Sequence, residues 1–268
     1  TELNAKANQL ARYLQSQAAI KPNSLLALCL DRNPETIIGI LGIMKAGGAY
    51  VPIDPEYPAE RINYILDDTQ TELVITQTHL VERLQKITDV DLIELDSDCY
   101  QNQCTTNLPI QNEATDIAYV IYTSGTTGKP KGACLSYKNL NNLVIIQKEK
   151  LKINDKSNVL QFASIIFDAS VWEIFSTLIF GARLSIISDK NRNYSELFIS
   201  YLVENNINIM TIPPVFLSTL ELKKLSGLKT LVVAGESCPE ILMKKWSKNR
   251  TFINAYGPTE ITVCATMH

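Results

Sequence analysis

The sequence predicts an α/β fold, with mainly parallel sheets packed against helices in layered subdomains. Two observations support this prediction. Short apolar runs typical of buried strands, such as 25–30 ("LLALCL") and 72–76 ("ELVIT"), alternate with longer segments whose apolar residues recur at helical spacing. Pro and Gly lie at the ends of many of these segments, and strand–helix alternation on this scale favours a parallel sheet. Such sheets bind ligands beyond the carboxyl ends of their strands.

The sequence of the first part of the chain predicts three helices that alternate with three strands. In chain order these are expected at residues 3–14, 25–30, 33–46, 49–54, 58–66 and 72–76. Asn33 and Pro34 begin the second helix, and Gly47 ends it. Residues 97–116 are polar and are the best candidate for a linker. We therefore expect a first subdomain over 1–110, incomplete at its N-terminus, and a second over 111–268.

The second part of the chain continues the same alternation. Strands are expected at 117–122, 158–164, 182–188, 207–212, 229–236 and from 251 into a turn at 260. Helices are expected after Ser136, from 168 to Gly181, over roughly 195–205 and after Pro239. Five polar stretches, "TSGTTGKPKG", "FDAS", "TIPP", "AGES" and "AYGPTE", fall at or just past the carboxyl end of a predicted strand. We interpret them as the lining of one cleft.

The stretch 122–132, "YTSGTTGKPKG", has the composition of an anion-binding loop. Its glycines allow backbone N–H groups to turn inward, and its hydroxyls and lysines add donors and positive charge. It is not a Walker A loop, because only two residues separate Gly125 from Gly128 and Pro130 disfavours a helix at Lys129. Taken alone, the stretch could equally be a polar surface hairpin.

Composition and charge exclude several classes of function. The net charge of −3 gives no electrostatic case for binding nucleic acid or an anionic membrane. No apolar run approaches the roughly 18 residues of a membrane span, and the N-terminus lacks the apolar segment of a signal peptide, so we expect a cytoplasmic protein. The six cysteines and two histidines lack zinc spacing, and we expect free thiols.

Together these motifs resemble the adenylate-forming superfamily. The stretch 122–132 is similar to the phosphate loop of that family. Residues 41–68, "FDASVWEIF" and "NAYGPTEITVCAT" resemble the amino-acid adenylation domains of nonribosomal peptide synthetases. Family domains are about twice this long, and the ribose-binding stretch, the hinge and the C-terminal lid with its lysine are absent here. The resemblance therefore implies a part of the large N-terminal portion, which we expect to be a poor enzyme alone.

The resemblance implies that an amino-acid carboxylate attacks the α-phosphorus of ATP and expels pyrophosphate. Glu260 would hold Mg²⁺, Thr259 would bind the α-phosphate, and Lys131 would act with them in catalysis. ATP would contact Thr123, Ser124, Gly125, Thr126, Thr127, Gly128, Lys129, Gly235, Glu236, Asn254, Ala255, Tyr256, Gly257 and Thr259. The partners would be a carrier protein bearing phosphopantetheine and the condensation domains of a synthetase for antibiotic-type peptides.

Asp168 carries the inference about the substrate. It precedes a helix, so it could be only an N-cap. By resemblance it pairs with the α-ammonium of an amino acid, which an acyl ligase has no need to bind. The side-chain pocket implied by the resemblance comprises Asp168, Ala169, Trp172, Thr211, Val232, Ala234, Ala255, Val263 and Cys264, a largely apolar lining that is similar to those associated with phenylalanine.

Each of these assignments has an alternative. The valines and alanines could be core packing, Tyr256 could be a core aromatic residue, Lys129 and Lys131 could be solvated charges, and Thr259-Glu260 could begin a helix without binding a ligand. For the whole protein, the alternatives are an acyl or aryl acid–CoA ligase and a non-catalytic nucleotide-binding fragment.

Overall fold

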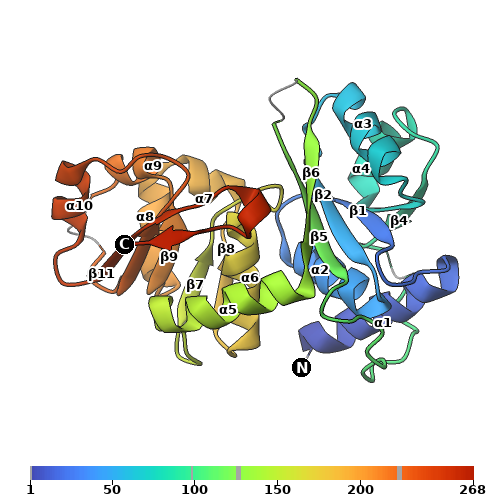
Figure 1. The fold of residues 1–268 in the computed structure, drawn as a ribbon, viewed down its shortest axis with the longest axis horizontal. Coiled ribbons are helices and arrows are strands. Elements are labelled where there is room, and N and C mark those ends of the chain that lie inside the picture. The colour runs from blue at the N-terminus through green and yellow to red at the C-terminus, as the bar shows by residue number, and fades with distance from the viewer. Residues whose placement is uncertain (1, 98, 125–127, 222–224) are drawn as a thin grey trace. The chain divides into compact units, whose positions relative to one another are not determined.

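The computed structural model describes residues 2–97, 99–124, 128–221 and 225–268. The chain forms two compact units, 1–140 and 141–268 (Figure 1). Among the described residues, none of the helices is both long and apolar enough to cross a membrane. Two mostly parallel sheets, each with helices packed against it, confirm the predicted fold class.

The first unit is built on one sheet with the strand order β4-β3-β1-β2-β5-β6 in its described residues. All neighbouring pairs are parallel except β5 with β6. The strands are β1 (Leu25–Cys29), β2 (Ala49–Ile53), β3 (Leu73–Thr76), β4 (Asp91–Glu94), β5 (Ile117–Thr123) and β6 (Lys131–Ser136). The helices are α1 (Glu2–Gln17), α2 (Pro34–Ala46), α3 (Ala59–Thr69) and α4 (Thr78–Gln85), and α5 (Tyr137–Leu151) leads into the second unit.

The second unit is built on a sheet with the order β12-β11-β10-β9-β7-β8, again within the described residues. Only the short β12 runs antiparallel. Its strands are β7 (Asn158–Gln161), β8 (Arg183–Ile186), β9 (Ile209–Ile212), β10 (Thr230–Val233), β11 (Thr251–Tyr256) and β12 (Thr266–Met267). Its helices are α6 (Ala169–Ile179), α7 (Asp189–Asn193), α8 (Ser195–Glu204), α9 (Pro214–Ser218) and α10 (Glu240–Trp246), with a 3₁₀ turn η2 (Thr259–Ile261).

Local sequence signals set the ends of α2 as predicted. The Asn33 side chain accepts a hydrogen bond from the Thr36 backbone N–H, which satisfies a donor at the start of the helix. Gly47 ends the helix at φ 102°, a left-handed conformation that glycine adopts without a steric penalty. These two signals depend only on neighbours in the sequence, which is why they could be identified there.

The position of the predicted phosphate loop differs from expectation. The sequence predicts that this loop shares one sheet edge with the other four polar stretches. However, β5 pairs with β2 of the first sheet, and the chain then returns as β6 beside β5. The strand β6 was not predicted. The strands on either side of the loop therefore belong to the first unit, which spans 1–140.

The close approach of α1 to α2 generates a stability prediction. A Cβ atom at Gly42 would lie 2.5 Å from Leu10 Cδ2, a carbon of a buried side chain. We expect Gly42→Ala to lower the free energy of unfolding by about 1–3 kcal/mol, because the well-packed interface must move apart. Gly227→Ala is the matched control, since nothing lies within 4 Å of its added Cβ. Chemical denaturation of both variants tests this, and equal stabilities would contradict it.

Candidate functional site

The predicted pocket residues of the second sheet share one of its faces. Thr211 on β9 lies directly beside Val232 on β10, which in turn lies beside Ile253 on β11. Paired residues of neighbouring strands point to the same face, and alternation along a strand adds Ala234 and Ala255 to that face. The residues that alternate with them belong to a separate hydrophobic core that also includes side chains of α8, α9 and α10; they are Met210, Ile212, Leu231 and Val233.

The start of α6 presents Asp168 and Ala169, with Trp172 one turn further on. Asp168 and Trp172 are four residues apart and lie on one side of the helix. Trp172 is buried, and its indole N–H has no hydrogen-bond partner among the described residues. Asp168 directly precedes the helix, but its side chain makes no N-cap hydrogen bond. Its carboxylate does accept from the backbone N–H of the adjacent Ala169, so a structural role at the start of the helix stays an alternative.

The electrostatic neighbours of Asp168 come from η2 and the residues that follow it. Burial raises the pKa of the Asp168 carboxyl, and the charge of Glu260 raises it further, whereas hydrogen bonds from the Thr259 hydroxyl and the Ala169 backbone N–H oppose the shift. Burial also raises the pKa of the Cys264 thiol, to which the charge of Asp168 contributes. The structure thus brings together residues predicted for the amino acid, the α-phosphate and the metal.

The backbone around the pocket residue Val263 is strained. Thr262 and Val263 both have positive φ, at 70° and 69°, and Val263 is β-branched. The Cys264 backbone N–H donates to the Thr262 carbonyl at 2.8 Å, which closes a tight turn about Val263. A Cβ at Gly257 would lie 2.5 Å from Cys264 Cα, so only glycine fits there. Strain of this kind concentrates at functional sites.

The residues predicted to contact adenine are accessible. Tyr256 is 72% exposed, and Asn254 is also exposed, although both lie on β11. Tyr256 is therefore not a core aromatic residue. Gly235 and Glu236 follow β10 and are exposed, and Gly235 has φ 88°, which accounts for a glycine at this turn. Both segments leave the sheet at the carboxyl ends of neighbouring parallel strands.

The donor set suits a metal that arrives with a nucleotide. Among the described residues, no group of three His, Cys, Asp or Glu side chains could hold a metal ion by itself. Glu260 is exposed in η2 and lies near a second carboxylate, Asp168. One protein carboxylate with nucleotide oxygens is a typical arrangement for Mg²⁺. The residues present therefore fit Mg²⁺ bound together with ATP.

Helix α3 anchors both ends of the predicted phosphate loop within the first unit. Before the loop, the Tyr122 hydroxyl donates to Asp68 Oδ2 at 2.6 Å. After the loop, the Tyr64 hydroxyl donates to the Pro130 carbonyl at 3.1 Å. Burial and the hydrogen bond to Asp68 raise the pKa of Tyr122 well above its usual range. Tyr64 and Asp68 are four residues apart, so one face of α3 holds both ends of the hairpin.

The loop residues themselves are only partly described. Gly125, Thr126 and Thr127 lie outside the described residues. Lys129 lies 6.0 Å above the centre of the Tyr64 ring, and Lys131 begins β6 opposite Thr123. Ser124, Gly128, Lys129 and Lys131 are exposed. The stretch is the connection of a β-hairpin, as the alternative interpretation proposed, and its exposed lysines remain compatible with an anion.

Glu173 was not identified from the sequence. It lies on α6 and is buried, and its Oε2 accepts hydrogen bonds from the backbone N–H groups of Phe162 and Ala163, both at 3.1 Å. It therefore fixes the segment between β7 and Asp168. A single carboxylate within the apolar run 171–180 was the signal that could have identified it, because a buried charge requires partners.

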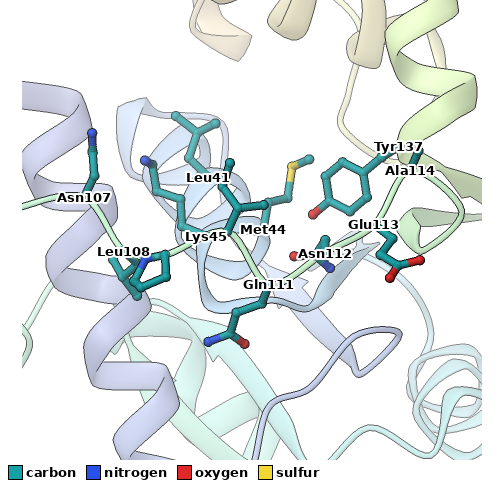
Figure 2. A pocket seen from close by; sticks show the side chains of 12 residues that line it. Leu41, Met44, Lys45, Asn107, Leu108, Gln111, Asn112, Glu113, Ala114 and Tyr137 are labelled. Atoms are coloured by element: carbon teal, nitrogen blue, oxygen red, sulfur yellow. The ribbon is translucent and has the colours of Figure 1, made fainter.

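A cavity of about 550 Å³ in the first unit lies away from these residues. Figure 2 shows Leu41, Met44 and Lys45 of α2 on one side of it and Tyr137 on another. Burial lowers the pKa of Lys45, and burial together with the charge of Asp116 raises the pKa of Tyr137 to about 12. None of the predicted site residues lines this cavity, so it does not mark the predicted site.

Comparison with known proteins agrees with the fold and the motifs. All of the chain, residues 1–268, matches the family of AMP-binding enzymes. Gramicidin S synthase 1 of Brevibacillus brevis is 44% identical over 266 residues, which are 99% of this chain and 24% of that protein. Tyrocidine synthase 1 of Brevibacillus parabrevis is 42% identical over 267 residues, with the same two shares.

Solved structures of nonribosomal peptide synthetases have the same fold. FmoA3, in its alpha-methyl-L-serine-AMP bound form, is 25% identical with a TM-score of 0.91, covering 100% of this chain and 31% of that chain. A four-domain synthetase bound to AMP and glycine is 27% identical with a TM-score of 0.86. The match covers 100% of this chain and 20% of that chain.

The chain belongs to the AMP-binding enzyme family. Its resemblance to the adenylation domains of nonribosomal peptide synthetases is confirmed. The chain spans about a quarter of the length of the two peptide synthases compared above.

The environment of Asp168 generates a prediction about stability and pH. Because burial raises its folded pKa, the carboxylate destabilises the fold, and stability is lost as the pH rises through that raised pKa. We expect Asp168→Asn to be more stable than the native protein at pH 7, with the difference shrinking toward pH 4. Chemical denaturation across this pH range tests it, with the exposed Asp155→Asn as control. A less stable Asn variant at pH 7 would contradict it.

Proposed function

We propose that the protein activates an amino acid, preferentially phenylalanine, by joining it to AMP from ATP with release of pyrophosphate. The phosphopantetheine thiol of a carrier protein then attacks the aminoacyl carbonyl carbon, forming a thioester while the bond to AMP breaks, and AMP and the thiol proton are released. The observation that carries the proposal is the partly buried Asp168 carboxylate beside Thr259 and Glu260. The likeness to gramicidin S synthase 1 and tyrocidine synthase 1 supports the assembly of a peptide as the destination of the activated residue.

Among the described residues Asp168 forms no ion pair with a cation, so a substrate can supply the cationic partner of this partly buried carboxylate. The pKa of Asp168 is raised because burial disfavours its charge, and the ordinary remedy is an ion pair. The α-ammonium group of an amino acid supplies that cation. An acyl or aryl acid has no such group, so Asp168 favours an amino-acid ligase over an acyl–CoA ligase.

The reaction requires positioning and charge neutralisation more than a base. One oxygen of the substrate carboxylate attacks the α-phosphorus, forming a new P–O bond while the bond to the oxygen bridging toward the β-phosphorus breaks. Pyrophosphate leaves with that electron pair. Thr259 would hydrogen-bond the α-phosphate, and Glu260 would hold the Mg²⁺ that accompanies ATP, which would neutralise phosphate charge. The family resemblance assigns the β- and γ-phosphates to the phosphate loop with Lys129 and Lys131.

The shared sheet face gives the pocket its selectivity. Thr211, Val232, Ala234 and Ala255 present small or apolar side chains from three neighbouring strands, and Val263 and Cys264 add to them from the strained turn. The two alanines leave volume for a large side chain. An apolar, roomy pocket above a fixed ammonium partner favours phenylalanine.

The first functional prediction concerns substrate selectivity, measured by substrate-dependent ATP–pyrophosphate exchange with the full-length protein. Phenylpropanoate should be activated very poorly, because it leaves the partly buried Asp168 carboxylate without an ion-pair partner, at a cost of up to about 3–5 kcal/mol. Tyrosine should fall about ten- to a hundredfold below phenylalanine, since its hydroxyl gives up hydrogen bonds to water and finds few partners in a largely apolar lining. Leucine should lose a similar factor because it leaves aromatic volume empty.

The control for this prediction is Asp168→Ala. It should reduce the preference for phenylalanine over phenylpropanoate while leaving the KM for ATP nearly unchanged. A native preference for a small, charged or deaminated acid would contradict the pocket assignment, and a complete lack of exchange with any amino acid would contradict the proposed reaction.

The second functional prediction concerns the metal. Glu260→Gln in the full-length protein keeps the shape of the side chain but removes the charge that a hard cation favours. Turnover should fall and should be partly restored by raised Mg²⁺ concentration. The exposed Glu149→Gln on α5 serves as control, with no expected change. An unaltered rate and metal dependence in Glu260→Gln would remove this residue from the site.

A further inference from the structure

A polar side chain, Gln147, occupies a buried position on α5. It is 0% exposed and follows the spacing of the buried apolar residues Leu143, Val144 and Leu151. On the outward side of the same helix, Ile145 and Ile146 are 58% and 42% exposed. An amphipathic helix would place an apolar residue at 147, so the amide at this position needs an explanation.

The amide of Gln147 is only weakly paired. Its Nε2 donates to Cys264 Sγ at 3.6 Å and to Met267 Sδ at 3.7 Å, and both sulfurs are weak acceptors. Its Oε1 is buried and has no partner among the described residues. Turning the amide by 180° would exchange its two ends and leave the NH₂ group unpaired instead. One polar end therefore lacks a partner in either orientation.

Stability does not account for this amide. A buried polar atom without a hydrogen bond destabilises a fold, and an apolar side chain of similar size would remove that penalty. Other buried groups among the described residues also lack a partner, Trp246 in the apolar core among them, so it is the place of Gln147 beside a predicted pocket residue that points to a ligand. The same reasoning applies to the Trp172 indole N–H, a second buried group without a partner among the described residues.

The position of Gln147 beside the predicted amino-acid pocket indicates which kind of ligand group could pair with its amide. The sulfur that its amide contacts belongs to Cys264, which is one of the predicted pocket residues and is electrostatically coupled to Asp168. The amide therefore lies beside the proposed amino-acid pocket, on the side reached by β12 and the strained turn. A hydroxyl group both donates and accepts, so it can pair with either end of the amide.

We propose that Gln147 is a specificity-determining residue of the amino-acid pocket, whose unpaired amide end pairs with a hydroxyl on an aromatic substrate side chain. The inference rests on the proposed function and refines it. Phenylalanine remains the preferred substrate because its ring fills the apolar lining. Gln147 limits the discrimination against tyrosine, which would be stronger if this position were apolar.

The test compares kcat/KM for tyrosine and phenylalanine in pyrophosphate exchange by the full-length protein. Gln147→Leu should lower the tyrosine-to-phenylalanine ratio about tenfold, the factor that one ordinary hydrogen bond provides. The KM for ATP should not change, and the midpoint of thermal unfolding should stay the same or rise. Gln147→Met provides a second apolar variant with a flexible side chain, and the exposed Ile145→Leu is the matched control on the same helix.

The possible outcomes distinguish a failure of the Gln147 role from a failure of the proposed function. A protein that activates phenylalanine but whose ratio is unchanged in both the Leu and Met variants overturns the role of Gln147 alone. If Gln147→Leu does not fold, the tyrosine-to-phenylalanine ratio of Gln147→Met decides the question. A native protein that supports exchange with no amino acid overturns the proposed function, and this inference with it.

Discussion

Parallel, in-register pairing of β9, β10 and β11 is the constraint on which the site depends. Because Thr211, Val232 and Ile253 lie side by side, alternate residues of three strands are sorted between two faces. One face packs with α8, α9 and α10 into a closed apolar core. The other carries the predicted pocket residues of the sheet together with Ile253, and the loops at the carboxyl ends carry the residues proposed to bind adenine, phosphate and metal. A slip of one residue would exchange the two faces.

Several residues on the site side carry features that lower stability. Burial raises the pKa of Asp168, Val263 holds a positive φ, and Gln147 and Trp172 each bury a polar group without a partner among the described residues. Such conflicts between local preference and structure are expected where function, not stability, fixes the residue. The anchoring of the phosphate-loop hairpin by Tyr64 and Asp68 is a fully satisfied arrangement in contrast.

The sequence could predict whatever depends on near neighbours. The bounds of α2 follow from Asn33 and Gly47, and the strands β1, β5 and β10 follow from short apolar runs. It could not predict β6, an exposed edge strand in which only Leu135 is buried. Nor could it assign the phosphate loop to the first sheet, since that depends on β5 pairing with the distant β2. The proximity of Asp168 to Glu260 was available only through the family resemblance, and Gln147 required a contact across 117 residues.

The central claim is that Asp168 is the partner of an amino-acid ammonium group. The most direct measurement is a crystal structure of the full-length protein with phenylalanine and AMP. We expect the substrate nitrogen within about 4 Å of an Asp168 carboxylate oxygen, the distance of an ion pair, with the phenyl ring over Ala234 and Ala255. An ammonium group bound elsewhere, with Asp168 left unpaired, would contradict it.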